Sequence, residues 1–388
     1  MGLLTAKIAL IRMWRHPRYF LNLIERKLRF KRRYAWVRSH LGEEPAPRPL
    51  IYKFMLNQRC NLHCSMCMLW GPTGFAKEED ERLQRAELPY AIIEKVIRES
   101  APDRPSFIFT GGEPFLYPHI DDIIRALKAK RTYGIILTNG TLLEGHIEEF
   151  EGNPWATLLI SLDGTKDVND VIRGEGVHDK VLANIKRLKA LKKPPFIGIQ
   201  FTIRPENAGD IHGFCREMAD AGVDWVLLNP TWFITSDEGK AYEEYMMENF
   251  GVEAKTHLGY SKSFDLDIGE FKRQYQKVLD NDWSMQISCY IPDPLRLMQT
   301  YVESGEVFSD PHLCLKQWLR MDINQEGKIA PCIQFPDLVF GDLGAQSIDE
   351  AWNGAEYADF RKKMLRCHPP ICRKCNNVYL YNAGRRSL

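Results

Sequence analysis

The strongest constraint in this sequence is a triplet of cysteines, Cys60, Cys64 and Cys67, within the run Arg59–Met68. Each iron of a [4Fe–4S] cluster takes one cysteine sulfur, so three thiolates on one loop leave the fourth iron open to a ligand that is not protein. A zinc site or a set of reduced thiols is the alternative. Zinc sites, however, are usually built from two separated CxxC-type pairs. The spacing therefore favours an iron–sulfur cluster with one open iron.

The composition is that of a globular chain. Its 388 residues are 44% hydrophobic, enough for one large or two modest domains with their own cores. We identify no secretory signal, and no apolar run reaches the roughly 18 to 20 residues that a membrane-spanning helix requires. Metal ligation in a reducing cytoplasm therefore explains the ten cysteines better than disulfides do.

Residues 1–45 are predicted to form a basic helical arm. Residues 1–40 contain eleven lysines and arginines and one acid, Glu25, although the whole chain is nearly neutral. Apolar residues recur there at near-helical spacing and are interrupted at Pro17, which predicts two amphipathic helices. Such helices can lie in a membrane interface, which would make this cytoplasmic protein peripheral to the membrane; alternatively, their apolar face docks on the protein's own core or on a partner. No nucleic-acid recognition motif accompanies them, so no nucleic-acid partner is expected.

After the proline-rich linker 45–49, apolar strand-like runs alternate with helical runs through residues 50–230. The alternation predicts an α/β fold, a partial (β/α)6 barrel of parallel strands, with its active site at the carboxyl ends of the strands. The expected strands are Leu50–Leu56, Ser106–Phe109, Gly134–Leu137, Thr157–Ser161, Phe196–Phe201 and Trp225–Leu228, and the expected helices include Tyr90–Glu99, Ile120–Lys130, Asp179–Leu191 and Ala208–Ala221.

Short polar motifs follow three of these strands: Thr110–Pro114 (TGGEP), Leu137–Gly140 (LTNG) and Ser161–Gly164 (SLDG). Adjacent glycines allow a backbone to approach a ligand closely, and Glu113 can accept a hydrogen bond from an ammonium group. A tight turn without chemical importance is the alternative for the GGEP segment.

The cysteine triplet followed by GGEP resembles the radical S-adenosylmethionine (SAM) superfamily. The resemblance implies that SAM binds the open iron, that the GGEP segment holds its methionine amino group, and that Arg173 pairs with its carboxylate. Arg173 could instead form a surface ion pair. The cofactor-binding residues expected on this basis are Met66, at the apolar position of the cysteine loop, Gly111, Gly112, Glu113, Ser161, Asp163 and Arg173.

The same resemblance implies the reaction. One electron from a donor such as flavodoxin or ferredoxin would pass through the reduced cluster and cleave SAM to methionine and a 5′-deoxyadenosyl radical, which abstracts a hydrogen atom from an unactivated C–H bond. The cofactor carries this chemistry, and the protein supplies binding and orientation. A catalytic triad or carboxylate pair is not needed.

Four cysteines near the C-terminus, Cys314, Cys332, Cys372 and Cys375, can supply all the ligands of a second [4Fe–4S] cluster. Their spacing, with Gly327, resembles the SPASM or twitch auxiliary-cluster domain of radical SAM enzymes, which we expect over residues 314–388. Taken alone, the four could form a zinc site. No cysteine follows Cys375, which favours one auxiliary cluster, as in twitch-like domains of small-molecule enzymes.

Three cysteines remain. Cys215 is expected in the core, because free cysteine behaves as a small hydrophobe. Cys367 could substitute as a cluster ligand, although the spacing favours Cys372 and Cys375. Cys289 could return a hydrogen atom to a substrate radical, which would make the enzyme an epimerase; a core position is the favoured alternative.

Residues 231–313 match no motif and are predicted to form a helical insertion that carries substrate specificity. Together with the single auxiliary cluster, the lack of a recognisable leader-peptide-binding domain favours a small-molecule or lipid-linked substrate that is oxidised or epimerised. The main alternative is a peptide- or protein-modifying maturase. An alternative of another class is a non-catalytic, membrane-tethered electron-transfer protein.

Overall fold

The computed structural model describes residues 6–77, 79–261, 264–303, 314–332 and 337–375. Its centre is a sheet with the strand order β7-β6-β5-β4-β3-β2-β1-β8-β9, in which only β9 runs antiparallel to its neighbour. The strands are β1 Ile51–Met55, β2 Ser106–Thr110, β3 Tyr133–Thr138, β4 Ala156–Ser161, β5 Phe196–Ile203, β6 Trp225–Pro230, β7 Gln286–Cys289, β8 Arg320–Ile323 and β9 Ile329–Ala330.

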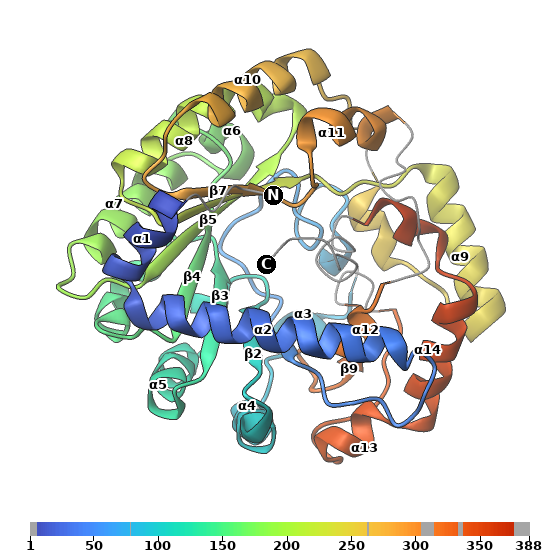
Figure 1. The fold of residues 1–388 in the computed structure, drawn as a ribbon. Coiled ribbons are helices and arrows are strands. Elements are labelled where there is room, and N and C mark those ends of the chain that lie inside the picture. Colours follow the sequence, from blue (N-terminus) through green and yellow to red (C-terminus); the bar gives the residue numbers. More distant parts are fainter. Residues whose placement is uncertain (1–5, 78, 262–263, 304–313, 333–336, 376–388) are drawn as a thin grey trace.

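Helices follow the strands and cover the outside of the sheet (Figure 1). They include α4 Tyr90–Ser100, α5 Ile120–Lys130, α6 Lys166–Arg173, α7 Val177–Lys189, α8 Ile211–Asp220 and α10 Ile268–Asp280. In contrast, α9 Ser236–Phe250 packs beside the C-terminal segment 355–374, and α11 Pro294–Glu303 and the short α3 Glu81–Arg85 are further helices. Shorter 3-10 turns include η3 Pro114–Leu116, η4 Leu143–Phe150, η5 Pro205–Asp210, η6 Thr256–Tyr260 and η8 Pro370–Lys374.

The predicted α/β partial barrel is confirmed, and all six expected strands are present. Three strands, β7, β8 and β9, were not expected. The segment 231–313, predicted to be helical, contributes β7, which pairs with β6; its four residues are too short to give a clear strand pattern. On the other side, β8 continues the parallel sheet beside β1, so the C-terminal region and the barrel share one sheet. The expected helix 208–221 is divided into η5 and α8.

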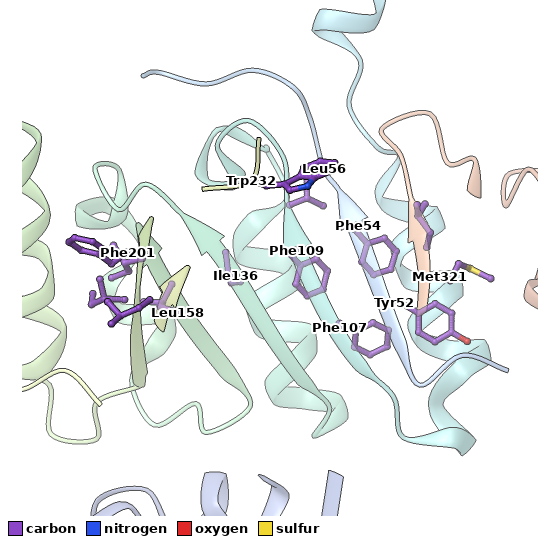
Figure 2. Packing of buried hydrophobic residues seen from close by; sticks show 14 of the residues in the cluster. Tyr52, Phe54, Leu56, Phe107, Phe109, Ile136, Leu158, Phe201, Trp232 and Met321 are labelled. Atoms are coloured by element: carbon purple, nitrogen blue, oxygen red, sulfur yellow. The ribbon is translucent and has the colours of Figure 1, made fainter. Parts of the chain in front are cut away.

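Aromatic side chains form the core between the sheet and its helices. Tyr52 and Phe54 of β1 lie beside Phe107 and Phe109 of β2, and each of the four is completely buried. Figure 2 shows the rings of Phe54 and Phe109 side by side. They stack with centroids 5.3 Å apart. Burying each such side chain contributes about 1.5–3 kcal/mol, so this layer fixes the strand ends that carry the candidate site.

The N-terminal arm forms two helices, α1 Ala6–Arg15 and α2 Pro17–Ser39. The α2 helix crosses the sheet in Figure 1 and packs at the amino ends of the strands. Its Tyr19 stacks on Phe196, the first residue of β5, with centroids 4.0 Å apart, and the Arg26 guanidinium lies 3.4 Å from the ring of Tyr133, the first residue of β3. One face of the arm therefore docks on the protein's own barrel. Among the described helices, none is long and apolar enough to cross a membrane.

The C-terminal region adds α12 Lys316–Leu319, α13 Ile348–Trp352 and α14 Ala355–Arg366 to β8 and β9. Arg361 is buried, with its guanidinium 4.4 Å and 4.5 Å from the rings of Trp352 and Tyr357. The same side chain pairs with Glu44, which ties α14 to the segment that follows α2.

Candidate functional site

The cysteine loop begins directly after β1. Cys64 is buried, whereas Cys60 and Cys67 are partly exposed. The Cys67 amide donates to the Cys64 carbonyl (3.0 Å), and the Leu62 amide lies 3.4 Å from Cys60 Sγ. Burial raises the pKa of the Cys60 thiol to about 12. A thiol in this environment needs a cation or metal to become a thiolate.

The two glycines of the GGEP segment pack against the backbone that precedes Cys60. The Gly112 amide donates to the Asn57 carbonyl (2.9 Å), and the Glu113 amide donates to the Arg59 carbonyl (2.7 Å). A Cβ on Gly112 would lie 2.2 Å from the carbonyl oxygens of Gln58 and Arg59. Only glycine permits this close approach, so the segment forms a backbone cradle beside the cysteine loop.

Glu113 is fully buried beneath the cradle. Its carboxylate accepts hydrogen bonds from the Thr138 hydroxyl (2.6 Å), the Asn139 amide (2.8 Å) and the Phe115 amide (3.0 Å). Burial raises its pKa although these donors oppose the shift. Glu113 therefore joins the ends of β2 and β3 in addition to its expected contact with the cofactor.

The loop after β3 also contacts the cysteine loop. Asn139 Nδ2 donates to Asn61 Oδ1 (2.9 Å) and lies 3.8 Å from Cys60 Sγ, and Asn61 Nδ2 donates to the Thr141 hydroxyl (2.9 Å). Sequence analysis singled out the LTNG motif as a whole but missed Asn61. Its position inside the cysteine triplet is the signal that could have identified it.

Asp163 and Arg173 form a buried ion pair, with Arg173 Nη2 2.7 Å from Asp163 Oδ2. Arg173 Nη1 lies 3.9 Å from Cys64 Sγ, and Asp163 Oδ1 accepts from the Thr202 amide (2.6 Å). Ser161 ends β4 and is partly exposed. Met66, also partly exposed, lies between Cys64 and Cys67. The ion pair is thus brought to the cysteine loop, and the predicted roles of these residues stay predictions.

The four C-terminal cysteines come together. Burial is the main reason that the pKa of the Cys372 thiol lies well above its usual value. The nearby charges of Cys375, Cys314 and Cys332 raise it further. Cys367 is exposed, and its thiol faces the adjacent His368 carbonyl. In the described part of the chain, no three Cys, His, Asp or Glu side chains converge on a single-ion site. A cubane distributes its ligands over four irons and does not require such convergence.

Cations surround these cysteines. Lys316 Nζ lies 2.8 Å from Asp322 Oδ2, and Arg320 Nε lies 2.7 Å from Asp322 Oδ1. Lys53 of β1 is paired in register with Asp322, and burial, followed by the charge of Arg320, lowers its pKa to about 8. The charge of Cys332 favours the protonated form of both lysines, Lys53 and Lys316, and so raises the pKa of each. Three cations around one carboxylate fit an anionic cluster of four thiolates. Sequence analysis missed Lys53 because it lies in an apolar strand.

The segment after β6 connects the two cysteine groups. Tyr260 is buried, its ring centroid lies 4.2 Å from that of Trp232, and its hydroxyl contacts the Met68 sulfur. Burial is the main reason that the pKa of Tyr260 lies well above its usual value, and the charges of Cys332, Cys375 and Cys67 raise it further. Because these cysteines belong to both cysteine groups, the Tyr260 ring lies near both. No sequence signal marked Tyr260 or Trp232.

Cys289 and Cys215 belong to the hydrophobic core. Cys289 lies on β7. The pKa of Tyr275 on α10 is raised mainly by burial and further by the charges of Cys289 and Cys215. Burial raises the pKa of the Cys289 thiol to about 12. Tyr275 of α10 therefore lies near Cys289, whose predicted role as a hydrogen-atom donor stays a prediction.

The residues present fit SAM and two clusters. The Nε of Arg173 is buried without a hydrogen-bond partner among the described residues and is available to a carboxylate. Gly111 and Gly112 let the GGEP backbone pack directly on the cysteine loop, because any side chain there would collide with residues 57–59. Each cysteine group supplies soft thiolate ligands, which iron–sulfur clusters require.

Comparison with known proteins agrees with these features. The family model of the radical SAM superfamily matches residues 55–218, and that of the SPASM iron–sulfur cluster-binding domain matches residues 314–376. The Fe-coproporphyrin III synthase of Methanosarcina barkeri is 25% identical over 189 residues, which are 47% of this chain and only 44% of that protein.

Other relatives match over most of the chain. The sporulation killing factor maturation protein SkfB of Bacillus subtilis is 23% identical over 338 residues, 86% of this chain and 70% of that protein. A protein of Pyrococcus furiosus that modifies the cofactor of a tungsten-containing aldehyde ferredoxin oxidoreductase is 22% identical over 83% of this chain and 85% of its own.

Among solved structures, SuiB of Streptococcus suis bound to its precursor peptide SuiA has the same fold, with a TM-score of 0.61 at 18% identity over 90% of this chain and 76% of SuiB. The chain therefore carries a radical SAM domain and a C-terminal SPASM domain, whose cofactors are SAM with a SAM-binding [4Fe–4S] cluster and an auxiliary [4Fe–4S] cluster.

Proposed function

We propose that this radical SAM enzyme modifies a peptide or protein. The observation that carries the proposal is the extent of the match to SkfB, a maturation protein, which covers 86% of the chain. The match to the Fe-coproporphyrin III synthase covers 47% of the chain. Sequence analysis favoured a small-molecule or lipid-linked substrate, and the comparisons support its peptide alternative better.

When bound, SAM and its cluster supply one-electron chemistry that can remove a hydrogen atom from a C–H bond. The residues of the chain bind and orient these groups. Cys60, Cys64 and Cys67 would hold the first cluster, the cradle of Gly111 and Gly112 with Glu113 would hold the amino group of SAM, and Ser161 would face its ribose. Arg173, fixed by Asp163, would bind its carboxylate. Cys314, Cys332, Cys372 and Cys375 would hold the second cluster.

The segment 231–261 supports a substrate site between the two cysteine groups. Its α9 packs on η8, which carries Cys372, and Lys374 Nζ lies 2.9 Å from the Glu238 carboxylate. Tyr260 and Trp232 supply a buried aromatic wall near both groups. A wall of this kind excludes water from a reactive intermediate and packs against side chains of a peptide.

A small-molecule substrate is the second candidate, favoured by the long match to the cofactor-modifying protein of Pyrococcus furiosus. Whether the outcome is oxidation or epimerisation, and whether flavodoxin or ferredoxin supplies the electron, are further predictions. Deuterium from D2O at a substrate carbon would indicate epimerisation, whereas loss of two electrons without label would indicate oxidation.

The test is 5′-deoxyadenosine formation by the anaerobically reconstituted, reduced enzyme in the presence of cell extract. One half of the extract is first digested with a protease that is then inactivated, and the variant Cys64→Ala is the control for cluster-dependent turnover. We expect the undigested extract to stimulate turnover and the digested extract to lose that effect. Stimulation that survives digestion would favour a small molecule. No product under any condition would support the electron-transfer alternative.

A further inference from the structure

The N-terminal arm exposes many apolar side chains on its outward face, although its inward face already packs on the barrel. Twelve large hydrophobic side chains are exposed in the described part of the chain, and seven of them lie on α1 and α2. They are Leu10, Met13, Trp14, Leu21, Ile24, Leu28 and Trp36, with Trp14 84% exposed and Leu21 66% exposed. Such a concentration on two neighbouring helices is unlike the scattered exposed hydrophobics of an ordinary surface.

Within α2, Leu21, Ile24 and Leu28 recur at the helical spacing and form one stripe. We call these three residues the outer stripe. Basic side chains accompany the stripe along the same helix: Arg18, Lys31 and Arg32 are exposed. Apolar residues beside cations are the composition of helices that lie in the plane of a membrane interface.

A cavity of about 360 Å³ lies between α2 and the underside of the barrel. Its cationic lining residues are Arg26, Arg29, Arg104, Lys130 and Arg131. The single carboxylate of the lining, Glu25, lies 2.8 Å from Arg104 and 3.7 Å from Arg29 and is already paired with them. The cavity is therefore strongly positive and suits an anion.

Three buried donors that line this cavity have no hydrogen-bond partner among the described residues. They are Asn22 Nδ2, Arg26 Nη1 and Arg29 Nε, all on α2. Buried polar groups are normally satisfied, so three orphan donors in one cationic cavity indicate a missing acceptor. A phosphate group has several acceptor oxygens and the charge that the cavity lacks.

The cavity and the outer stripe are neighbours on the helix. Asn22, Glu25 and Arg29 each directly follow a stripe residue in the sequence, so the cavity face lies about 100° around the helix from the stripe. A molecule with a phosphate beside an apolar chain would reach both faces at once. This arrangement matches a phospholipid better than a free anion, because a free anion would make no contact with the outer stripe.

We propose that α1 and α2 dock the enzyme on an anionic phospholipid surface, with a headgroup phosphate in the cavity and the outer stripe in the acyl boundary. The arm packs at the amino ends of the strands, through Tyr19 on Phe196 and His16 on Asp224. The cysteine loop and the GGEP segment follow the carboxyl ends of β1 and β2. The docked enzyme therefore directs its candidate active site away from the lipid, toward a substrate in solution.

The test is flotation of the reconstituted full-length enzyme with vesicles of phosphatidylcholine alone or of equimolar phosphatidylglycerol and phosphatidylcholine. The double variant Leu21→Glu/Leu28→Glu removes the stripe, and Arg29→Gln and Lys130→Gln weaken the cavity. The matched controls are Leu279→Glu and Arg273→Gln on α10. Leu279 is 49% exposed, and the side chain of Arg273 is 65% exposed. Circular dichroism and iron content verify folding of each variant.

We expect the wild-type enzyme to float with anionic vesicles and not with phosphatidylcholine vesicles. The stripe variant should bind anionic vesicles at least about tenfold more weakly than the wild type, and each cavity variant severalfold more weakly. The control variants should bind as the wild type does. Absence of wild-type flotation, or equal flotation of the stripe variant, overturns the proposal. Inorganic phosphate binding without vesicle binding would identify a free-anion site instead. A dimer lost only in the stripe variant, without vesicle binding, would identify self-association. Neither vesicle result depends on the substrate proposed above.

Discussion

Arg173 and Asp163 form an ion pair that is almost completely excluded from water, with Arg173 Nη2 2.7 Å from Asp163 Oδ2. A second guanidinium nitrogen lies 3.9 Å from Cys64 Sγ, and the third, Nε, has no hydrogen-bond partner within the part of the chain that the structure describes. Burial raises the pKa of Asp163, and the charge of Arg173 opposes that shift. The pair therefore fixes a guanidinium group beside the cysteine loop with one donor left for a ligand.

Replacement of Asp163 by asparagine should destabilise the fold and weaken SAM binding. Asparagine keeps the shape of the side chain but leaves the Arg173 charge buried without its counter-ion, which typically costs about 3–5 kcal/mol. Urea unfolding and equilibrium dialysis with SAM measure the two effects. The control is Asp179→Asn, which breaks an exposed pair with Lys166 and should change little. Equal behaviour of the two variants would show that the buried pair has no special role.

Replacement of Gly112 by alanine should displace the cysteine loop. The new Cβ would lie 2.2 Å from two backbone carbonyl oxygens, so the loop or the GGEP segment must move. A shift of about 1 Å at a reacting centre can lower the rate of product formation on the order of a hundredfold. Gly145→Ala is the matched control, since its Cβ would meet nothing within 4 Å. Measured rates of 5′-deoxyadenosine formation that fall equally in both variants would contradict this account.

The auxiliary cysteines should differ in their effect on iron content. Cys372→Ala removes a thiol that lies among the other three, so we expect loss of the auxiliary cluster and of about half the iron per chain. Cys367→Ala removes an exposed thiol and should leave iron content unchanged. Iron and acid-labile sulfide analysis, with Mössbauer spectra, measures both. If only Cys367→Ala lost iron, Cys367 would be the cluster ligand in place of Cys372.

Local patterns predicted the parts of the molecule that depend on local physics. The six strands and helix Ile120–Lys130 follow from apolar periodicity, and the cysteine and GGEP motifs follow from their spacing. The pairing of β8 with β1 and the position of Tyr260 near both cysteine groups depend on contacts between distant segments. Likewise, periodicity predicted the two arm helices but could not decide which face packs inward, because α2 has apolar residues on both faces.

The attachment of the arm should weaken in acid. Asp224 is buried, which alone would raise its pKa, but the charge of Lys189 and the contact with His16 Nε2 (3.1 Å) hold it at about 2. A carboxyl whose folded pKa lies below its unfolded value, here about 3.9, stabilises the fold above that unfolded value, and the contribution is lost as pH falls toward 2. The shift corresponds to about 2–3 kcal/mol.

The free energy of unfolding of cluster-free protein, compared between wild type and Asp224→Asn from pH 7 to pH 2, tests this contribution without interference from acid loss of iron. The difference should be largest above about pH 4 and should shrink as pH falls further, because protonation then removes the same charge that the substitution removes. Proteolysis of α1 and α2 should accelerate in parallel, since His16 and Lys189 lose their shared partner. A difference that is constant over the whole range would show that Asp224 acts through packing alone and that its charge does not hold the arm.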